Sequence, residues 1–128
     1  MTTDSVTPTA SVLVVEDSTA IRRLFEVVLR DVADPLFIVA NQDEANQLLA
    51  TESIDVVVME PQGPNEVRWG LLNDLKAAAI PAIIVTSRVD EQVQAEATRR
   101  GAFAFLSKPF MPAELQAVIC SITGASDR

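Results

Sequence analysis

The stretch Ile54 to Glu60, IDVVVME, predicts a buried strand in the middle of the chain. Four consecutive apolar residues, three of them valine, lead to an acid that is followed at once by Pro61. A short apolar run without polar residues at helical spacing is typical of a strand that is buried on both faces. Open α/β sheets bind ligands at the carboxyl ends of such strands, so Glu60 lies where a functional site is expected.

A second run near the N-terminus has the same construction. Residues 12–17, VLVVED, are apolar at first and end in the acids Glu16 and Asp17. If both runs are strands of one parallel sheet, their carboxylates lie at the same edge of that sheet. The two runs therefore predict an acidic crevice.

The rest of the chain alternates between short apolar runs and segments whose apolar residues have helical spacing. The predicted strands cover residues 12–15, 36–40, 54–59, 82–86 and 102–106. The predicted helices are one capped by Ser18 or Thr19, one capped by Asp43, two over 66–78 and 90–100, and one that begins at Pro112. This order favours a parallel five-stranded sheet with helices on both faces, a doubly wound (βα)5 fold.

Helical spacing also predicts which side chains are buried. The first helix is expected to bury Ile21, Leu24, Phe25, Val28 and Leu29. The third is expected to present Trp69, Leu72 and Leu75 on one face, with Leu71 beside them. The fourth has only a thin stripe of Val89, Val93 and Ala97, which indicates a marginally held element, with Gly101 as its C-cap.

Composition limits the class of protein. With 128 residues, 48% of them hydrophobic, the chain is expected to form one domain, at residues 12–123, between a disordered leader at 1–11 and a tail at 124–128. A net charge of −8 argues against direct binding of nucleic acid. No apolar run reaches the length of a membrane span, and the first residues are unlike a signal peptide. A single cysteine, Cys120, is compatible with the cytoplasm, and the absence of histidine excludes His-based catalysis.

The predicted carboxyl ends of four strands carry polar side chains in order: Glu16 and Asp17, Glu60, Thr86 and Ser87, and Lys108. Clustered carboxylates repel one another, so a cation is expected among them, and oxygen ligands favour Mg²⁺ or Ca²⁺. Each piece taken alone is weak evidence, because acids after strands are more often solvated loops or helix caps. Together they predict an anion or phosphoryl cradle.

At this point the sequence resembles the response-regulator receiver family, the flavodoxin-like, CheY-like phosphoacceptor domains of two-component signalling. VLVVED is similar to the first strand of the family with its acidic pair, and PAIIVTS to the fourth strand with its switch hydroxyl. GAFAFLSKPF is similar to the fifth strand and the lysine that follows it. Arg22 and Pro64 also match family positions. The resemblance covers the chain from Val12 to Ile122.

The resemblance implies a role for individual residues. Glu16 and Asp17 would form the acidic pocket and hold Mg²⁺, a candidate cofactor, together with Glu60 and the main-chain carbonyl of Gln62. Thr86 and Lys108 would contact phosphoryl oxygens. Phe105 would be the switch aromatic, and the fourth helix, fifth strand and last helix would form the switching surface.

The chain departs from the family at the phosphoacceptor, where Glu60 stands in place of aspartate. The extra methylene moves the carboxylate by roughly one C–C bond, about 1.5 Å. In-line phosphoryl transfer tolerates little displacement, so normal phosphorylation at Glu60 is not expected. The longer acid could instead project its charge toward Thr86 and Lys108 and imitate the phosphorylated state.

The leading hypothesis is a stand-alone receiver module of two-component or phosphorelay signalling, not an enzyme, that acts through protein–protein contacts. Its expected partners are a sensor histidine kinase or phosphotransfer protein and a downstream protein target, without nucleic acid or membrane, and a homodimer is left open. The alternatives are a pseudo-receiver locked in one conformation, independent of phosphorylation, and an Mg²⁺-dependent phosphatase with Asp17 as nucleophile.

Overall fold

The computed structural model describes residues 10–60, 69–86, 91–108 and 110–123, which form an alternating series of strands and helices. The strands are β1 (Ala10–Val15), β2 (Ala33–Val39), β3 (Val56–Met59), β4 (Ala82–Thr86) and β5 (Ala104–Ser107). The helices are α1 (Thr19–Leu29), α2 (Gln42–Leu49), α3 (Gly70–Ala77), α4 (Glu91–Arg99) and α5 (Pro112–Thr123).

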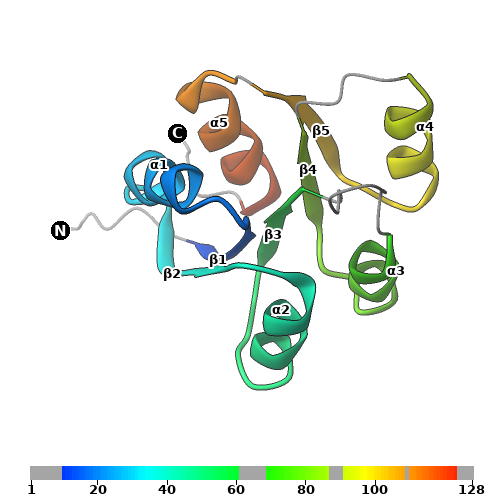
Figure 1. Cartoon of the computed structure of the whole chain (residues 1–128), viewed down its shortest axis with the longest axis horizontal. Coiled ribbons are helices and arrows are strands. Elements are labelled where there is room, and N and C mark those ends of the chain that lie inside the picture. The colour runs from blue at the N-terminus through cyan, green and yellow to red at the C-terminus, as the bar shows by residue number, and fades with distance from the viewer. Residues whose placement is uncertain (1–9, 61–68, 87–90, 109, 124–128) are drawn as a thin grey trace, which may run out of the picture.

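The strands form one parallel sheet in the order β2-β1-β3-β4-β5 (Figure 1). From β1 the chain passes first to β2 on one side and then to β3 on the other. Sheets of this kind bind ligands outside the carboxyl ends of the strands, at the point where the strand order reverses. The predicted doubly wound α/β fold is confirmed, and it places the candidate site beside β1 and β3.

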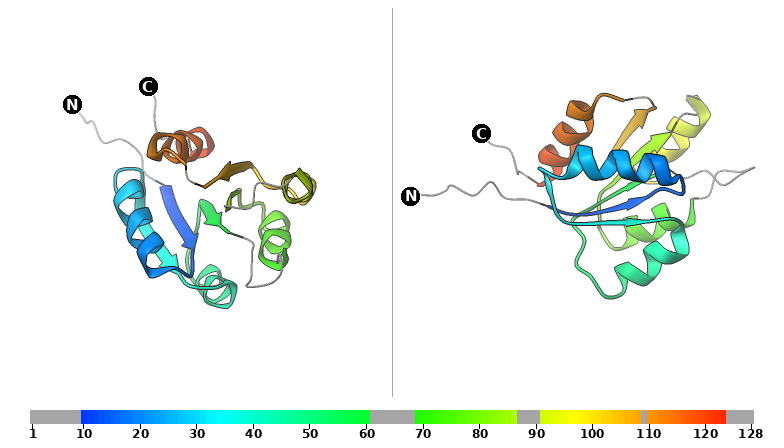
Figure 2. Two further views of the ribbon diagram at one scale, coloured as in Figure 1. Left: turned by 45° about the horizontal axis from the view of Figure 1, so that its top comes forward. Right: turned by 60° about the vertical axis from the view of Figure 1, so that its left-hand side comes forward.

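Alternating strand residues face two separate hydrophobic cores. Val12, Val14, Val56 and Val58 pack on one side with residues of α1 and α5, such as Phe25 and Ile119. The intervening residues of the same strands pack on the other side with α2, α3 and α4. Figure 2 shows the two helical layers with the sheet between them. Both faces of the central strands are therefore buried, which explains their continuous apolar runs.

Two strands begin earlier than predicted. β1 begins at Ala10, inside the predicted leader, and β2 begins at Ala33 and includes Pro35. Ala10 pairs with Ala33 but Val12 pairs with Leu36, so β2 has one extra residue at this point. Proline is accepted here because β2 is an edge strand with one side free of ladder partners. Residues 1–9 and 124–128 lie outside the described residues, and the domain boundary at residue 12 stays a prediction.

The predicted helices also need corrections. Leu24 is 47% exposed, while Phe25, Val28 and Leu29 of the same helix are buried. Asn41, and not Asp43, caps α2, because its side chain accepts a hydrogen bond from the backbone N–H of Glu44.

The third helix begins at Gly70, so Trp69 lies at its N-cap and not within it. The predicted start at residue 66 and the predicted stripe residue Val89 fall outside the described residues. Ser18 caps α1 and Pro112 begins α5, both as predicted. The remaining differences from the predicted elements are shifts of a few residues at their ends.

Candidate functional site

The carboxyl ends of four neighbouring strands bring four polar side chains together. Glu16 directly follows β1, Glu60 follows β3, Thr86 ends β4, and Lys108 follows β5. Parallel pairing aligns these ends, since Val15 pairs with Met59 and Thr86 pairs with Ser107. The main-chain N–H of Lys108 also donates to the carbonyl oxygen of Thr86, at 2.8 Å. The expected convergence of these residues is therefore present in the fold.

Glu60 is the centre of the cluster. Its Oε1 accepts a hydrogen bond from Nζ of Lys108 at 2.6 Å, and its Oε2 accepts one from the Thr86 hydroxyl at 3.3 Å. The Glu60 side chain is 19% exposed and Thr86 is fully buried. Hydrogen bonds to ionised groups are stronger than neutral ones, especially where water is partly excluded. Both carboxylate oxygens of Glu60 thus have a partner within the protein.

Glu16 is the second acid that contacts Lys108. The distance from Nζ of Lys108 to Oε1 of Glu16 is 3.1 Å, and the Glu16 side chain is only 4% exposed. The other oxygen, Oε2, accepts the backbone N–H of Ser18 at 3.1 Å, at the beginning of α1. Such a buried carboxylate needs these partners, because an unpaired buried charge is strongly unfavourable.

Lys108 is the cation that these acids share, and this environment changes its pKa. Burial of the ammonium opposes its charge and lowers the pKa, but the hydrogen bonds and charges of Glu60 and Glu16 outweigh burial. The pKa of Lys108 is therefore raised above its ordinary value of 10.5. Lysine stays protonated throughout the physiological range and neutralises part of the acidic pocket.

Asp17 does not join this cluster in the same way, since its side chain is exposed. Among the residues that the structure describes, no three Asp, Glu, Cys or His side chains are grouped so that they could hold a metal ion. The oxygen donors suit Mg²⁺ in kind, but the carboxylate oxygens of Glu16 and Glu60 are turned toward protein donors. Gln62 lies outside the described residues. The predicted metal ligands remain a prediction.

Phe105 lies in β5 on the same side of the sheet as α3 and α4. It is half-buried and packs against the core cluster that contains Met59, Leu72 and Ile84. It pairs with Ile84, two residues before Thr86 on the neighbouring strand. The predicted switch aromatic is therefore close to Thr86 along the sheet.

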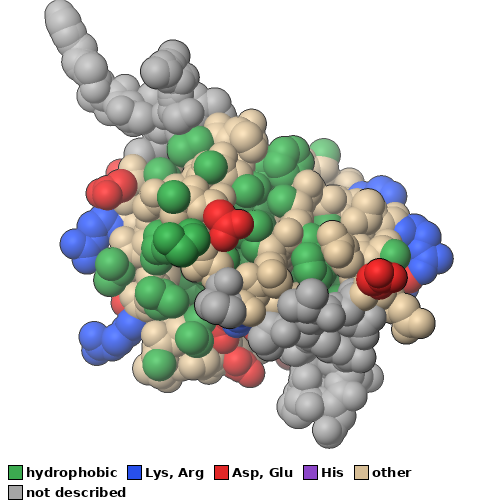
Figure 3. Space-filling model, turned by 90° about the horizontal axis from the view of Figure 1, so that it is seen from above, with side chains coloured by type: hydrophobic (Ala, Val, Ile, Leu, Met, Phe, Trp, Pro, Cys, Tyr) green, Lys and Arg blue, Asp and Glu red, His purple; other side chains and the backbone are tan. Residues whose placement is uncertain are grey.

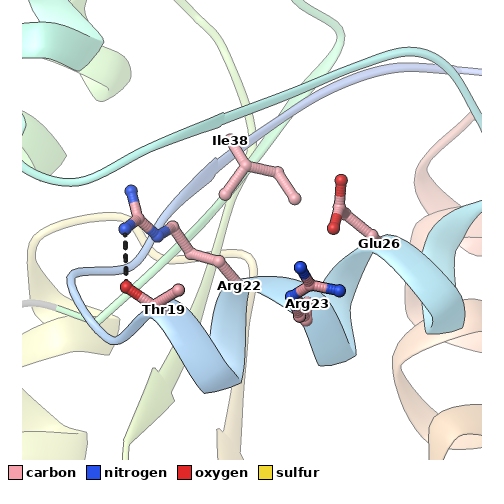
Figure 4. A pocket seen from close by; sticks show the side chains of 5 residues that line it. All are labelled: Thr19, Arg22, Arg23, Glu26 and Ile38. Carbon is pink, nitrogen blue, oxygen red and sulfur yellow. Dashed lines mark hydrogen bonds between the residues drawn. The ribbon is translucent and has the colours of Figure 1, made fainter.

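A shallow hollow of about 480 Å³ lies beside the first helix, outside the acidic cluster (Figure 4). It is lined by Thr19, Arg22, Arg23 and Glu26 of α1 and by Ile38 of the edge strand β2. Arg22 donates a hydrogen bond to the hydroxyl of Thr19 at 3.1 Å, one turn earlier in the helix. Arg22, which the resemblance also identified, thus lines the surface of α1 and has no described contact with Glu60.

One group of interacting residues was not anticipated from the sequence. Arg100 lies over the ring of Trp69, 5.6 Å from its centroid, and also contacts Glu96 and Asn73. The sequence predicted only that Trp69 packs toward the core, and Trp69 does pack, partly buried, against the cluster that contains Leu72 and Leu75. The four-residue spacing of Glu96 and Arg100 is a signal for their ion pair, but nothing local predicts the contacts with α3.

A comparison with known proteins found one matching family model. Residues 12–120 match the family model of the response regulator receiver domain. A probable transcriptional regulator ycf27 of Cyanidium caldarium is 30% identical over 111 residues, which cover 86% of this chain and 45% of that protein. The chain thus spans about half the length of the curated relatives it matches.

Solved structures agree with the fold. The receiver domain of nitrogen regulatory protein C is 28% identical, with a TM-score of 0.77 over 92% of this chain and 98% of that one. The receiver domain of sensor histidine kinase PA1611 from Pseudomonas aeruginosa is 22% identical, with a TM-score of 0.76 over 91% of this chain and 99% of that one. That structure is described with a magnesium ion coordinated in its active site cleft.

Proposed function

Because the chain belongs to the response regulator receiver domain family of two-component signalling, we propose that it is a receiver module in which Glu60 replaces the phosphoacceptor and blocks normal phosphorylation. Receiver domains are typically signalling modules and not enzymes, and we propose the same for this chain. It would act through protein–protein contacts. That it works as a stand-alone module stays a prediction.

The contacts of Glu60 carry this proposal. Thr86 and Lys108 are the residues that the family resemblance assigns to phosphoryl oxygens, and here the Glu60 carboxylate accepts hydrogen bonds from both. Its two oxygens thus use the donors that a phosphoryl group on a shorter aspartate would need. A reacting atom displaced by about 1 Å can cost on the order of 100-fold in rate. These contacts favour the pseudo-receiver alternative, in which Glu60 holds one conformation without phosphorylation.

The test is incubation of wild type and of Glu60→Asp with acetyl phosphate and Mg²⁺, followed by mass measurement of the intact protein. The wild type is expected to gain no stoichiometric phosphoryl group, and Glu60→Asp is expected to gain one. Glu60→Gln is the matched control, because it keeps the length of Glu60 without a nucleophilic carboxylate. Stoichiometric, acid-stable and base-labile labelling of wild-type Glu60 would overturn the proposal.

We also propose that the acidic pocket binds Mg²⁺. The residues that would hold it are Glu16, the exposed Asp17 and the carbonyl of Gln62, with Glu60 as a further ligand. The ion would supply positive charge to the acidic pocket. Because Glu60 is held by Lys108 and Thr86, we expect Mg²⁺ to bind Glu60→Asp more tightly than wild type, as measured by calorimetric titration. Equal affinities would mean that the length of residue 60 does not matter to the metal.

The expected partners are a sensor histidine kinase or phosphotransfer protein and a downstream protein. Figure 3 looks onto the α5 side of the molecule and shows hydrophobic side chains at the surface over much of it. Exposed large hydrophobic residues include Leu24 and Val27 of α1, Phe103 before β5 and Met111 before α5. Phe103 and Met111 flank β5 and α5, which supports protein–protein contact at the proposed switching surface of α4, β5 and α5, whereas Leu24 and Val27 belong to α1.

The location and the assembly of the protein are also proposals. Within the described residues, no helix is both long enough and apolar enough to cross a membrane. We propose a cytoplasmic location, where a single cysteine needs no disulfide partner. A homodimer stays an open prediction, and sedimentation of the purified protein at several concentrations would test it.

A further inference from the structure

The edge strand β2 has two halves of different character. Within the described part of the chain, β2 pairs with β1 alone and ends the sheet (Figure 1). Its first half carries Asp34, Pro35 and the extra residue, which are features that prevent an edge from pairing with another chain. Its second half, Leu36 to Val39, is apolar throughout and only partly buried. An apolar edge without such protection is a template for a further strand.

The main chain of this second half directs polar groups outward. The carbonyl oxygen of Val39 accepts a hydrogen bond from the chain directly after β1, so it faces the sheet. The next N–H, that of Ala40, faces the other way and donates to the side chain of Glu44. Because main-chain groups alternate in direction along an extended strand, those of Leu36 and Ile38 face outward. These groups can bond to a strand that is added to the edge.

The hollow beside α1 opens on the same edge (Figure 4). Ile38 of β2 forms one wall, and α1 contributes side chains of both charges, among them Arg23 and Glu26. Arg23 and Glu26 are exposed, and neither takes part in the ion pairs or side-chain hydrogen bonds of the described residues. Two opposite charges on one surface can each pair with the other across a two-fold axis, because such an interface is self-complementary.

Antiparallel pairing of two β2 strands satisfies the outward groups. If a two-fold axis passes Phe37, Leu36 of each copy lies opposite Ile38 of the other. Each of these pairs then exchanges both of its main-chain hydrogen bonds, as in any antiparallel ladder. The sequence between the paired residues contains no charge and no proline that would oppose the contact.

The same axis brings complementary charges of the two α1 helices together. The α1 side chains that line the hollow are centred just before Arg23 and lie beside Ile38. Phe37 is one strand residue away, about 3.3 Å, which equals about two residues of a helix that runs opposite to the strand. The axis therefore passes α1 just after Leu24. This level places Arg23 opposite Glu26 of the partner subunit.

From these observations we propose that the chain forms a two-fold dimer in which β2 pairs with β2 of a second copy and joins the two sheets into one. The contact between Arg23 and Glu26 of the partner subunit occurs twice and fixes the register. The interface uses no residue of the acidic cluster. It goes beyond the proposed function and does not depend on whether Glu60 is phosphorylated.

Sedimentation equilibrium over a range of protein concentrations, at about 0.15 M salt, tests this dimer. That salt screens the long-range repulsion between two chains of net charge −8. Wild type is expected to show an equilibrium between monomer and dimer. Arg23→Glu is expected to weaken the dimer about ten-fold or more, because two attractive pairs become repulsive. Combining Arg23→Glu with Glu26→Arg restores opposite charges and is expected to recover most of the affinity.

Lys76→Glu is the matched control. It makes the same change of net charge at an exposed residue of α3, on the opposite face of the sheet from α1. It is expected to leave the dimer affinity as in wild type. Because all the substituted residues are exposed, each variant is expected to keep its fold, which far-UV circular dichroism checks.

Hydrogen exchange locates the interface within the molecule. The amides of Leu36 and Ile38 are expected to exchange more slowly as the concentration of wild type is raised. In Arg23→Glu the same amides are expected to keep their fast exchange up to higher concentrations, in step with the weaker dimer.

A wild type that stays monomeric at every concentration would overturn the proposal. A dimer that protects amides of β5 or α5 and not those of β2 would refute the interface. Equal weakening by Arg23→Glu and Lys76→Glu would do so too, because the loss would then follow net charge alone. None of these measurements involves phosphorylation of Glu60, so failure of the dimer and failure of the proposed function can be told apart.

Discussion

At the scale of single residues, the central feature is one lysine shared by two acids. Lys108 contacts Glu16 and Glu60 at 3.1 and 2.6 Å, and Glu60 also accepts the hydroxyl of Thr86. Each of these contacts can be removed by a single substitution. The cluster therefore offers direct tests of how much its contacts stabilise the protein.

Lys108 should make the stability of the protein depend on pH in the alkaline range. Its pKa is raised on folding, so its contribution is complete below the ordinary lysine value of 10.5 and is lost as pH rises through the higher folded value. Urea unfolding of wild type and Lys108→Met should show a difference of about 1–3 kcal/mol at neutral pH. The difference should shrink only in solutions more alkaline than that ordinary value. A loss that begins near neutrality would contradict the raised pKa.

Glu60→Gln should destabilise the fold, because it removes the charge that Lys108 contacts while it keeps the shape of the side chain. Hydrogen bonds to charged groups contribute about 1.5–3 kcal/mol, and Glu60 is mostly buried. Chemical denaturation should therefore show a loss of about 1–3 kcal/mol. Glu52→Gln, at an exposed position after α2, is the control and should change stability by less than about 0.5 kcal/mol.

At the scale of elements, α1 shows how two adjacent apolar residues can have different roles. Phe25 is 2% exposed and stacks on Phe110, with ring centroids 6.0 Å apart, whereas Leu24 is 47% exposed. Phe25→Ala should cost about 3–5 kcal/mol in the free energy of unfolding, because it leaves a cavity between α1 and the segment before α5. Leu24→Ala should cost less than about 1 kcal/mol. Comparable losses in a urea titration would mean that Leu24 is buried after all.

Two glycines provide a second comparison between elements. Gly101 follows α4 with a φ of 95°, and a Cβ there would lie 2.8 Å from Cδ of Lys76. Gly70 begins α3, and a Cβ there would meet nothing within 4 Å. Gly101→Ala should therefore destabilise by about 1–2 kcal/mol, and Gly70→Ala should stabilise by up to about 1 kcal/mol. Thermal unfolding of both variants measures the opposite signs, and equal signs would contradict the backbone geometry.

At the scale of the whole molecule, charge limits the choice of partner. The net charge is −8, and binding to duplex DNA depends mainly on basic groups that neutralise phosphates. The described chain should therefore not retard duplex DNA in a gel at physiological salt, although the curated relatives it matches are named as probable transcriptional regulators. Retardation that weakens as salt is raised would show a basic surface that the net charge conceals.

The sequence predicted the fold because local and global signals agree in the strands. Continuous runs such as those before Glu16 and Glu60 are apolar at every position, and each proved to face two hydrophobic cores. The same runs predicted which acids lie at the carboxyl edge, since a strand can deliver the next residue nowhere else. The prediction failed where packing between elements decides burial. Helical spacing placed Leu24 inside, but Phe110 and residues of α5 cover Phe25 and leave Leu24 exposed.

By itself, then, the sequence determined the (βα)5 order and the residues that gather at one edge of the sheet. Only the tertiary structure decided how those residues use their charges. It turned the longer carboxylate of Glu60 onto Lys108 and Thr86 and left Asp17 exposed. It also placed Arg100 over Trp69. The physical reason is that strand periodicity is a local property, whereas contacts between side chains from different elements depend on distances that only the packed fold sets.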